Sequence, residues 1–398
     1  MNNFDKADRN SKRFRNIKLC IFLSGLSVFA QIYLFQPLLP MVSEHFQRSV
    51  GDSSLLVSSS TIGMALGLFF FAFKADDFSR KKLMVFSLLT SAILTIISVW
   101  IPSLPLLIAI GVIKGFVISG VSSVALAYLT EEVSVAIVGM AISMYISGNT
   151  IGGMSGRILA TIIAGEMGWQ KAVLIIGIES LLLGLIFWKF FPESRFFVPQ
   201  KINFSRKLKQ MGKFISDPYM LRLYLIAALL MGVFVSVYNY LTFRLESPPF
   251  SLNHIFVAFI FLMYTFGVFG TMATSILSQR FEQKYILRIF IITMLGGVFL
   301  LLSHNITLLI IGLALLTFSF FAVHTMASRL ITLHAKEGKS SATSIYWLFY
   351  YFGSSILGSG TGYLLHATSW AGFITVLLLT VVISFLLTIG NRNPQNIS

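Results

Sequence analysis

Long apolar runs separated by short polar segments are the dominant pattern along this chain. A helix of about 20 apolar residues crosses the ~30 Å hydrocarbon core of a bilayer, and most of these runs reach that length. The runs are continuous, whereas a lipid-facing β-strand would alternate apolar and polar residues. Helices also satisfy every backbone polar group within one segment. The pattern therefore predicts an all-α integral membrane protein.

Twelve transmembrane helices are expected, in two groups of six. The first group lies near residues 17–40, 55–73, 83–101, 104–127, 135–164 and 171–191. The second lies near residues 221–243, 255–276, 285–303, 308–331, 341–365 and 370–389. We therefore expect a single transporter domain over 1–398, made of an N-terminal bundle at 17–191, a cytoplasmic linker at 192–220 and a C-terminal bundle at 221–390.

Composition agrees with this prediction and excludes several classes of protein. Only 11% of residues are charged and 56% are hydrophobic, whereas soluble domains carry about 25% charged residues. The formal net charge of +15 comes from short segments between apolar runs, so it does not indicate a nucleic-acid partner. The single cysteine, Cys20, cannot form an intramolecular disulfide. The first run is too long for a signal-peptide core and is expected to stay as a span.

The distribution of lysine and arginine predicts the orientation. If the N-terminus is cytoplasmic, nearly all of them fall in cytoplasmic segments. The exceptions are Arg48, Lys171 and Arg244 outside, with Lys114 and Arg157 inside spans. This asymmetry follows the positive-inside rule and predicts a plasma-membrane protein with both termini cytoplasmic.

The linker at 192–220 is basic, with apolar residues at mostly helical spacing. It is typical of an amphipathic helix on the inner leaflet, and a disordered basic tether is the alternative.

The two groups of helices repeat one another weakly. Ala72 to Lys81 resembles Ser275 to Lys284, and the glycines of the fifth span recur in the eleventh. Duplicated halves imply a substrate site between them near the bilayer midplane, with transport by alternating access.

Short motifs around the second, fourth and fifth spans carry a family resemblance. Between the second and third spans, Asp76, Arg80 and Lys81 match the acidic residue and the basic pair of a loop motif. The glycines and the first arginine of that motif are replaced by other residues here. In the fourth span the motif has an arginine that this chain lacks, and Lys114 lies three residues after that position. In the fifth span, Gly148, Gly152, Gly153 and Gly156 lie where a glycine motif is expected. The proline and the last glycine of that motif are replaced here. These motifs resemble the major facilitator superfamily, in particular its twelve-span bacterial efflux branch.

A second set of residues resembles a narrower branch, exporters of drugs and metabolites related to acriflavine-sensitivity proteins. This set is Tyr33-x-x-Gln36-Pro37, Tyr238-Asn239-Tyr240, Ala322-x-His324 and Tyr350-Tyr351-x-Gly353. The resemblance implies that spans 1, 5, 7 and 11 line a central cavity. Substrate-contacting candidates are accordingly Tyr33, Gln36, Asn149, Arg157, Tyr238, Asn239, Tyr240, His324, Tyr346, Tyr350 and Tyr351. Aromatic faces with hydroxyl groups suit bulky or cationic ligands, although packing and interfacial roles are the alternatives.

Charged residues at the cytoplasmic ends of spans 2 to 4 are candidates for a gate. These are Asp76, Asp77, Arg80, Lys81, Glu131 and Glu132. Ion pairs among them would hold the cytoplasmic side closed in one of two states. The alternative is that the basic residues only obey the positive-inside rule.

Ionisable residues inside spans are candidates for coupling to protons, because a charge in hydrocarbon is costly and is usually retained for function. Glu179, His324 and Lys114 form this set, and histidine ordinarily titrates near neutral pH. For each of them a structural role remains the alternative, and Arg157 and Lys114 would also suit an anionic substrate.

We therefore expect a secondary transporter that exports drug-like amphiphiles in exchange for protons, as a monomer. Export of a sugar or an anionic metabolite such as a siderophore is the alternative. A non-transporting receptor or assembly protein and a membrane enzyme are alternatives from other classes. The sequence has no metal-ligand spacing, nucleophile elbow or phosphate loop, so no cofactor and no enzymatic activity are expected.

Overall fold

The computed structural model describes residues 6–199, 204–335 and 337–389. The first five and last nine residues, 200–203 of the predicted linker and residue 336 therefore lie outside the description. The described residues are helical nearly throughout, with a single β-bridge between Ala7 and Val133, which confirms the predicted all-α class. Ten of the helical segments in these ranges are long and apolar enough to cross a membrane.

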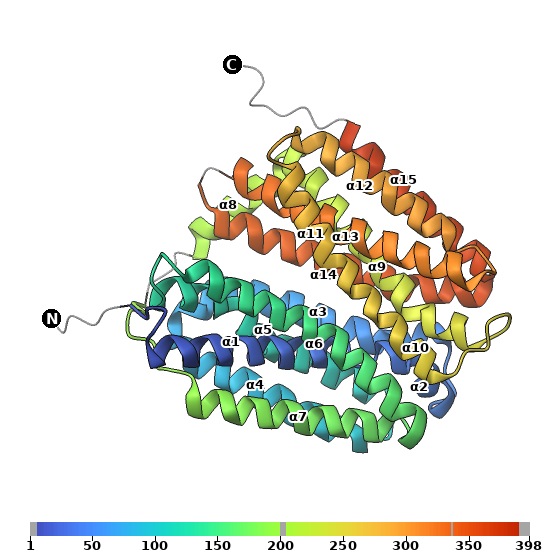
Figure 1. The fold of residues 1–398 in the computed structure, drawn as a ribbon, viewed down its shortest axis with the longest axis horizontal. Coiled ribbons are helices and arrows are strands. Elements are labelled where there is room, and N and C mark those ends of the chain that lie inside the picture. Colours follow the sequence, from blue (N-terminus) through green and yellow to red (C-terminus); the bar gives the residue numbers. More distant parts are fainter. Residues whose placement is uncertain (1–5, 200–203, 336, 390–398) are drawn as a thin grey trace. The chain divides into compact units, whose positions relative to one another are not determined.

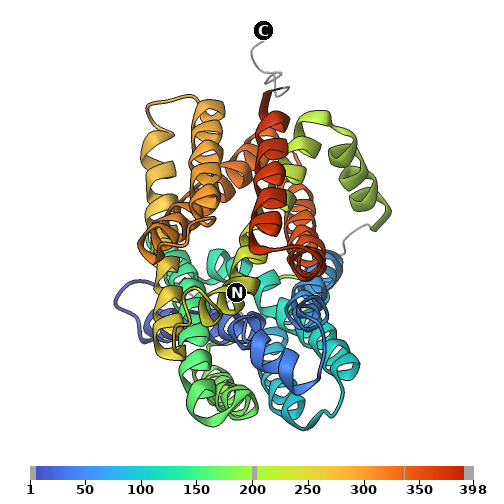
Figure 2. The same ribbon diagram turned by 90° about the vertical axis from the view of Figure 1, so that its right-hand side faces the viewer.

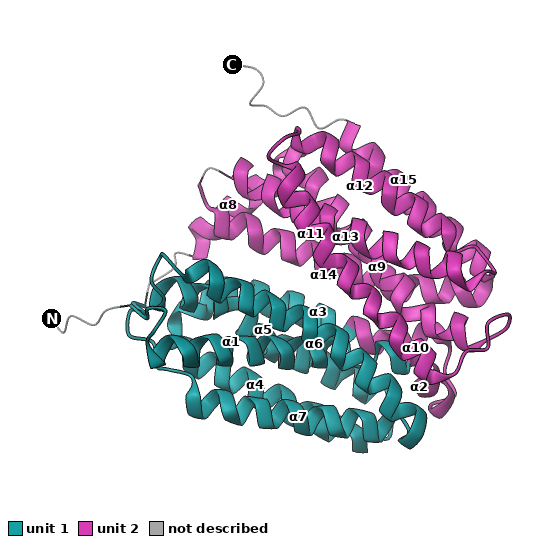
Figure 3. Ribbon diagram, in the orientation of Figure 1, with its two compact units in different colours: residues 1–38, 59–203 teal, residues 39–58, 204–398 magenta. Residues whose placement is uncertain are grey.

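The chain divides into two compact units, residues 1–38 with 59–203 and residues 39–58 with 204–398 (Figure 3). Helix α3, Val50–Lys74, contributes its first nine residues to unit 2 and the rest to unit 1. The other helices of unit 1 are α1 Lys12–Ile32, η1 Gln36–Leu38, η2 Ala75–Asp77, α4 Arg80–Ile97, η3 Ser98–Trp100, α5 Leu104–Glu132, α6 Val138–Met167 and α7 Trp169–Phe190 (Figure 1).

Unit 2 contains the second half of the sequence together with α2. Its helices are α2 Leu39–His45, α8 Phe204–Ser216, α9 Pro218–Glu246, α10 His254–Ile260, η4 Phe261–Tyr264, α11 Thr265–Leu277, α12 Gln283–Leu300, α13 Ile306–His334, α14 Lys339–Ala367 and α15 Trp370–Ile389.

Two predicted spans are interrupted in the structure. The run at 17–40 ends as α1 at Ile32 and continues through η1, where Pro37 supplies no backbone N–H for a regular α-helix. The run at 255–276 changes from α10 to α11 through a 3₁₀ turn. Each predicted span therefore has a helical counterpart, but these two are interrupted, and the span at 83–101 ends in the 3₁₀ segment η3.

Helices α6 and α14 are as long as the others but are not among the ten apolar segments, because both are rich in Gly, Ser and Thr. The glycines pack directly against a neighbouring backbone. A Cβ atom built at Gly148 would clash with the carbonyl oxygen of Phe22 in α1, and one at Gly353 would clash with Ala228 in α9. Small residues thus let α6 approach α1 in unit 1 and let α14 approach α9 in unit 2.

This packing predicts opposite effects of one substitution at two positions of α14. Gly353→Ala must push α14 away from α9, because its Cβ would overlap the Ala228 backbone, and overpacking of this kind costs about 1–3 kcal/mol. Gly360→Ala meets no atom within 4 Å and should leave the protein as stable or slightly more stable. Thermal unfolding of the two purified variants measures the difference. Equal melting temperatures would show that the α9–α14 contact does not depend on Gly353.

Candidate functional site

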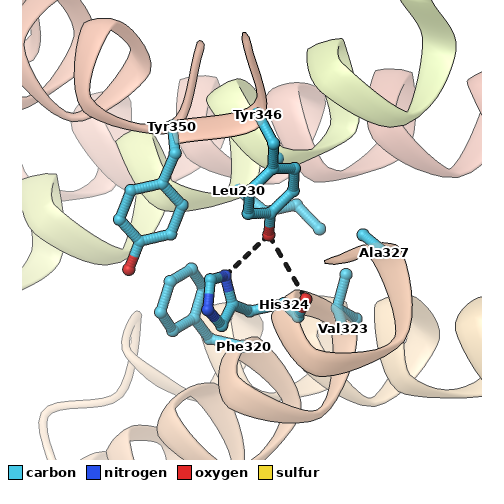
Figure 4. A pocket seen from close by; sticks show the side chains of 8 residues that line it. Leu230, Phe320, Val323, His324, Ala327, Tyr346 and Tyr350 are labelled. Carbon is cyan, nitrogen blue, oxygen red and sulfur yellow. Dashed lines mark hydrogen bonds between the residues drawn. The ribbon is translucent and has the colours of Figure 1, made fainter. Parts of the chain in front are cut away.

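An aromatic pocket lies inside unit 2, between α9, α13 and α14 (Figure 4). The space inside it is small, about 10 Å³, which is room for little more than one water molecule. Its lining is apolar or aromatic except for one imidazole, and consists of Ala227, Leu230, Phe320, Val323, His324, Ala327, Tyr346 and Tyr350. Sites for drug-sized ligands enclose about 300–1,000 Å³, so a bulky ligand would require these side chains to move.

The hydroxyl of Tyr346 makes two hydrogen-bond contacts with His324. It lies 2.6 Å from Nδ1 of the imidazole and donates to the carbonyl oxygen of His324 at 3.2 Å. A hydroxyl has one proton to donate, so both contacts are satisfied together when Nδ1–H donates to the tyrosine oxygen. The lone pair of a neutral His324 is then on Nε2, which makes no hydrogen bond within the described residues.

Aromatic rings surround this imidazole. Its centroid lies 5.0 Å from that of Tyr350, 5.5 Å from Trp347 and 6.2 Å from Phe320, whose ring stacks on it. Figure 4 shows Tyr350 and Tyr346 on one side of His324, with Phe320 beside it. Aromatic faces attract cations, and a neutral Nε2 accepts a hydrogen bond. The chemistry of this lining suits a group that donates a hydrogen bond or carries positive charge.

The other predicted site residues of unit 2 hold its helices together. The Tyr238 hydroxyl shares a hydrogen bond with Thr317 of α13 at 2.8 Å. Asn239 and Tyr240 both donate to the carbonyl oxygen of Gly358 in α14, at 3.0 and 2.6 Å. Tyr351 packs on Trp347 with ring centroids 5.9 Å apart. Within the described part of unit 2, these contacts fix the walls of the pocket.

In unit 1 the predicted residues Tyr33 and Gln36 meet Arg157 from α6. Nε of Arg157 donates to Oε1 of Gln36 at 2.7 Å, and Nη1 donates to the carbonyl oxygen of Gly153. The Tyr33 ring lies 4.5 Å from the guanidinium carbon. The interruption between α1 and α2 therefore brings an amide oxygen and a ring face to a buried cation, as a buried charge requires.

Lys114 of α5 is the second buried cation of unit 1. Its Nζ donates to the carbonyl oxygen of Gln31 at 3.2 Å and lies 5.5 Å from the centre of the Phe35 ring. Asn149 packs against Gly25 of α1, where a Cβ atom would overlap its side chain. Both predicted residues thus lie where other helices of unit 1 contact α1.

Glu179 lies on α7 and is half-buried, with no hydrogen bond or ion pair among the described residues. Its neighbours along the helix, Ile175, Ile178 and Leu182, are exposed. The structure therefore places this carboxyl group beside the outward-facing apolar stripe of α7.

Arg80 is the centre of a cluster of charged residues in unit 1, where the sequence predicts a cytoplasmic gate. Nη1 pairs with Asp76 at 2.8 Å and Nη2 with Glu131 at 2.8 Å, while the ring of Phe197 lies 4.4 Å from the guanidinium carbon. The side chain of Arg80 is only 7% exposed, so these contacts are shielded from water. Three of the predicted gate residues are thus in direct contact with one another.

The remaining gate residues have different partners. Asp77 pairs with the exposed Lys74, and Lys81 pairs with Glu193. Glu132 is fully buried, pairs with Arg13 and accepts backbone hydrogen bonds from Arg195 and Phe196 at 2.6 and 2.8 Å. The structure therefore separates Glu131, in the Arg80 cluster, from Glu132, which holds the segment after α7.

Sequence reasoning missed several residues of these sites. Phe320 and Leu230 line the pocket, Trp347 stacks near it, and Gln31 accepts from Lys114. Phe320 precedes His324 by one helical turn, and this spacing could have identified it. The others carried no signal, because a Leu, Trp or Gln in a membrane span is usually read as packing.

Comparisons with known proteins agree with this architecture. The family model of the Major Facilitator Superfamily matches residues 21–359. A transporter of Buchnera aphidicola subsp. Schizaphis graminum is 36% identical over 381 residues, covering 96% of this chain and 92% of the relative. The inner membrane transport protein YnfM of Escherichia coli is 33% identical over 384 residues, covering 96% and 92%.

Solved transporters share the fold at low sequence identity. A bacterial homologue of the human lysosomal transporter Spinster matches with a TM-score of 0.78 at 16% identity, covering 96% of this chain and 97% of that one. The xylose transporter XylE of Escherichia coli matches with a TM-score of 0.73 at 14% identity, covering 95% and 98%. The predicted family fold is therefore confirmed.

The Arg80 cluster predicts different effects of one substitution at two adjacent positions. Asp76→Asn removes a shielded charge pair worth about 1 kcal/mol and should loosen the end of unit 1 at which Arg80 lies. Backbone hydrogen exchange around Arg80 and Phe197 should then be about fivefold faster. Asp77→Asn is the matched control, because its partner is the exposed Lys74, and it should leave exchange unchanged. Identical exchange in both variants would exclude Asp76 from the gate.

Proposed function

Because the chain belongs to the Major Facilitator Superfamily, we propose that it is a proton-coupled exporter of small organic solutes that works by alternating access. The observation that carries this proposal is the aromatic pocket of unit 2, in whose wall His324 is hydrogen-bonded to Tyr346. The pocket lining contains no carboxylate that would hold a metal ion or a strongly hydrated cation. Its chemistry therefore favours amphipathic solutes with a cationic or hydrogen-bond-donating end.

We assign proton coupling to His324. A proton on Nε2 leaves the Nδ1–H bond to Tyr346 in place, so protonation changes the charge of the pocket without breaking its geometry. A protonated imidazole would repel a cationic solute, which makes the proton and the solute alternative occupants. Glu179 and Lys114 are the other candidates for this role, and Lys114 has a neutral carbonyl as its hydrogen-bond acceptor.

Export of an anionic metabolite is the second candidate function. It is favoured by two buried cations in unit 1, Lys114 and Arg157, the first of which donates to a neutral carbonyl oxygen. A carboxylate-bearing solute, such as a siderophore, would gain charge-assisted hydrogen bonds from both.

The membrane in which this transport takes place is, in our proposal, the bacterial inner membrane, with both termini in the cytoplasm. The name of the Escherichia coli relative and the asymmetric distribution of lysine and arginine support this placement.

Binding to the pocket is expected to quench Trp347, whose ring centroid lies 5.5 Å from that of His324. Cationic dyes, sugars and chelators are titrated against the purified protein, and saturable quenching is expected from cationic aromatic compounds. His324→Gln should weaken this binding about tenfold, or ~1.4 kcal/mol, the order of one hydrogen bond. Trp347→Phe is the control, in which the signal disappears while binding persists by equilibrium dialysis. Unchanged affinity in His324→Gln would exclude this pocket as the binding site.

Proton coupling is tested by comparing two substitutions in vesicles. Because His324 is the proposed proton acceptor, His324→Gln should abolish the dependence of solute movement on an imposed pH gradient. Glu179→Gln should retain it, because Glu179 lies beside the outward-facing stripe of α7. The reverse result, with the dependence lost only in Glu179→Gln, would transfer the coupling role to that carboxyl group.

A further inference from the structure

Helix α8 lies next to the first turns of two long helices of unit 2, α9 and α14. It ends at Ser216, and the membrane-crossing helix α9 begins at Pro218. On one side Met211 is buried, and Gln210 accepts a hydrogen bond of 2.9 Å from Ser341 in the first turn of α14. Figure 2 shows α8 beside the bundle of unit 2 rather than within it. The short connection to α9 and the contact with α14 therefore fix α8 where these two helices begin.

A stripe of large apolar side chains on α8 is open to the surroundings. Phe204 is 58% exposed, Leu208 45% and Ile215 40%. Their spacings of four and seven residues place all three on one side of the helix, next to the edge that contains Met211. An apolar stripe of this kind at the start of a membrane-crossing helix is suited to the boundary between lipid headgroups and acyl chains.

The remainder of α8 is strongly basic. Between Phe204 and Ser216 the sequence has Arg206, Lys207, Lys209 and Lys213 and no acidic residue. Lys209 and Lys213 are exposed and lie four residues apart, a spacing at which like charges repel one another on a helix. The nearest acidic residue in the sequence, Asp217, accepts from the backbone of α9 and pairs with His334. Neutralisation of these lysines therefore requires negative charge from outside this helix.

We propose that α8 binds the anionic phospholipids of the inner leaflet. The stripe formed by Phe204, Leu208 and Ile215 enters the headgroup boundary, and Lys209 and Lys213 are neutralised by lipid phosphates. The complementary charge and the position at the start of α9 both point to a membrane surface as the occupant. The interaction rests on the cytoplasmic orientation proposed above, but it does not depend on which solute the chain transports.

The test uses the full chain with a fluorescent reporter on α8. Gly212→Cys provides an attachment point, because a Cβ atom there meets no other atom within 4 Å, and the native Cys20 is buried. The labelled protein is placed in nanodiscs of phosphatidylcholine with increasing fractions of phosphatidylglycerol. We expect the dye to become accessible to lipid-borne quenchers as the anionic fraction rises, and high salt to reverse this change.

Substitution of charged residues tests whether the dye on α8 is protected by binding to anionic lipid or only by burial against the protein. Lys209→Gln with Lys213→Gln should shift the response to higher phosphatidylglycerol fractions, because the equilibrium for membrane binding at a given composition weakens about fivefold for each lysine removed. Lys12→Gln with Arg15→Gln removes the same charge from exposed positions of α1 and should leave the titration unchanged. Two results would overturn the proposal. One is a dye that stays in water at every lipid composition, and the other is a dye equally protected in phosphatidylcholine or detergent alone.

Discussion

Close approach of glycine to a neighbouring backbone is the constraint on which both units depend. In unit 1 Gly148, Gly152 and Gly156 of α6 face α1, and in unit 2 Gly353 and Gly358 of α14 face α9, so each half of the chain contains the same kind of helix pair. The hydrogen bonds of the buried polar groups cross these pairs. Arg157 of α6 reaches Gln36 just beyond α1, and Asn239 of α9 reaches Gly358 of α14. Within a membrane, where no water satisfies such groups, close packing and internal hydrogen bonding must be achieved together.

The two units differ in the ionisable groups that they bury. Unit 1 holds two buried cations supported by carbonyl oxygens and ring faces, whereas the pocket of unit 2 holds an imidazole among aromatic rings. This difference underlies the two candidate solute classes, cationic amphiphiles and anionic metabolites. It also explains why the motif Tyr33-x-x-Gln36 contains an aromatic ring and an amide three residues apart, since both contact Arg157.

Hydrophobic pattern alone predicted the all-α class and a helical counterpart for each span, because lipid imposes a length and a composition that few other constraints modify. It did not predict the break after Ile32, where Pro37 and a 3₁₀ turn replace a regular helix. Nor did it predict partners, because a contact such as Arg157 to Gln36 joins residues 121 positions apart. Of the gate residues, the Arg80 cluster agrees with the expected pairing, but Glu132 and Asp77 have partners that no local spacing indicates.

Transport by the purified chain in proteoliposomes with an imposed pH gradient tests the central claim most directly. A panel of cationic dyes, sugars and chelators is screened for movement above protein-free vesicles. The account predicts movement of an organic solute that stops when a protonophore dissipates the gradient. Saturable binding without any movement would contradict it and would favour a membrane receptor.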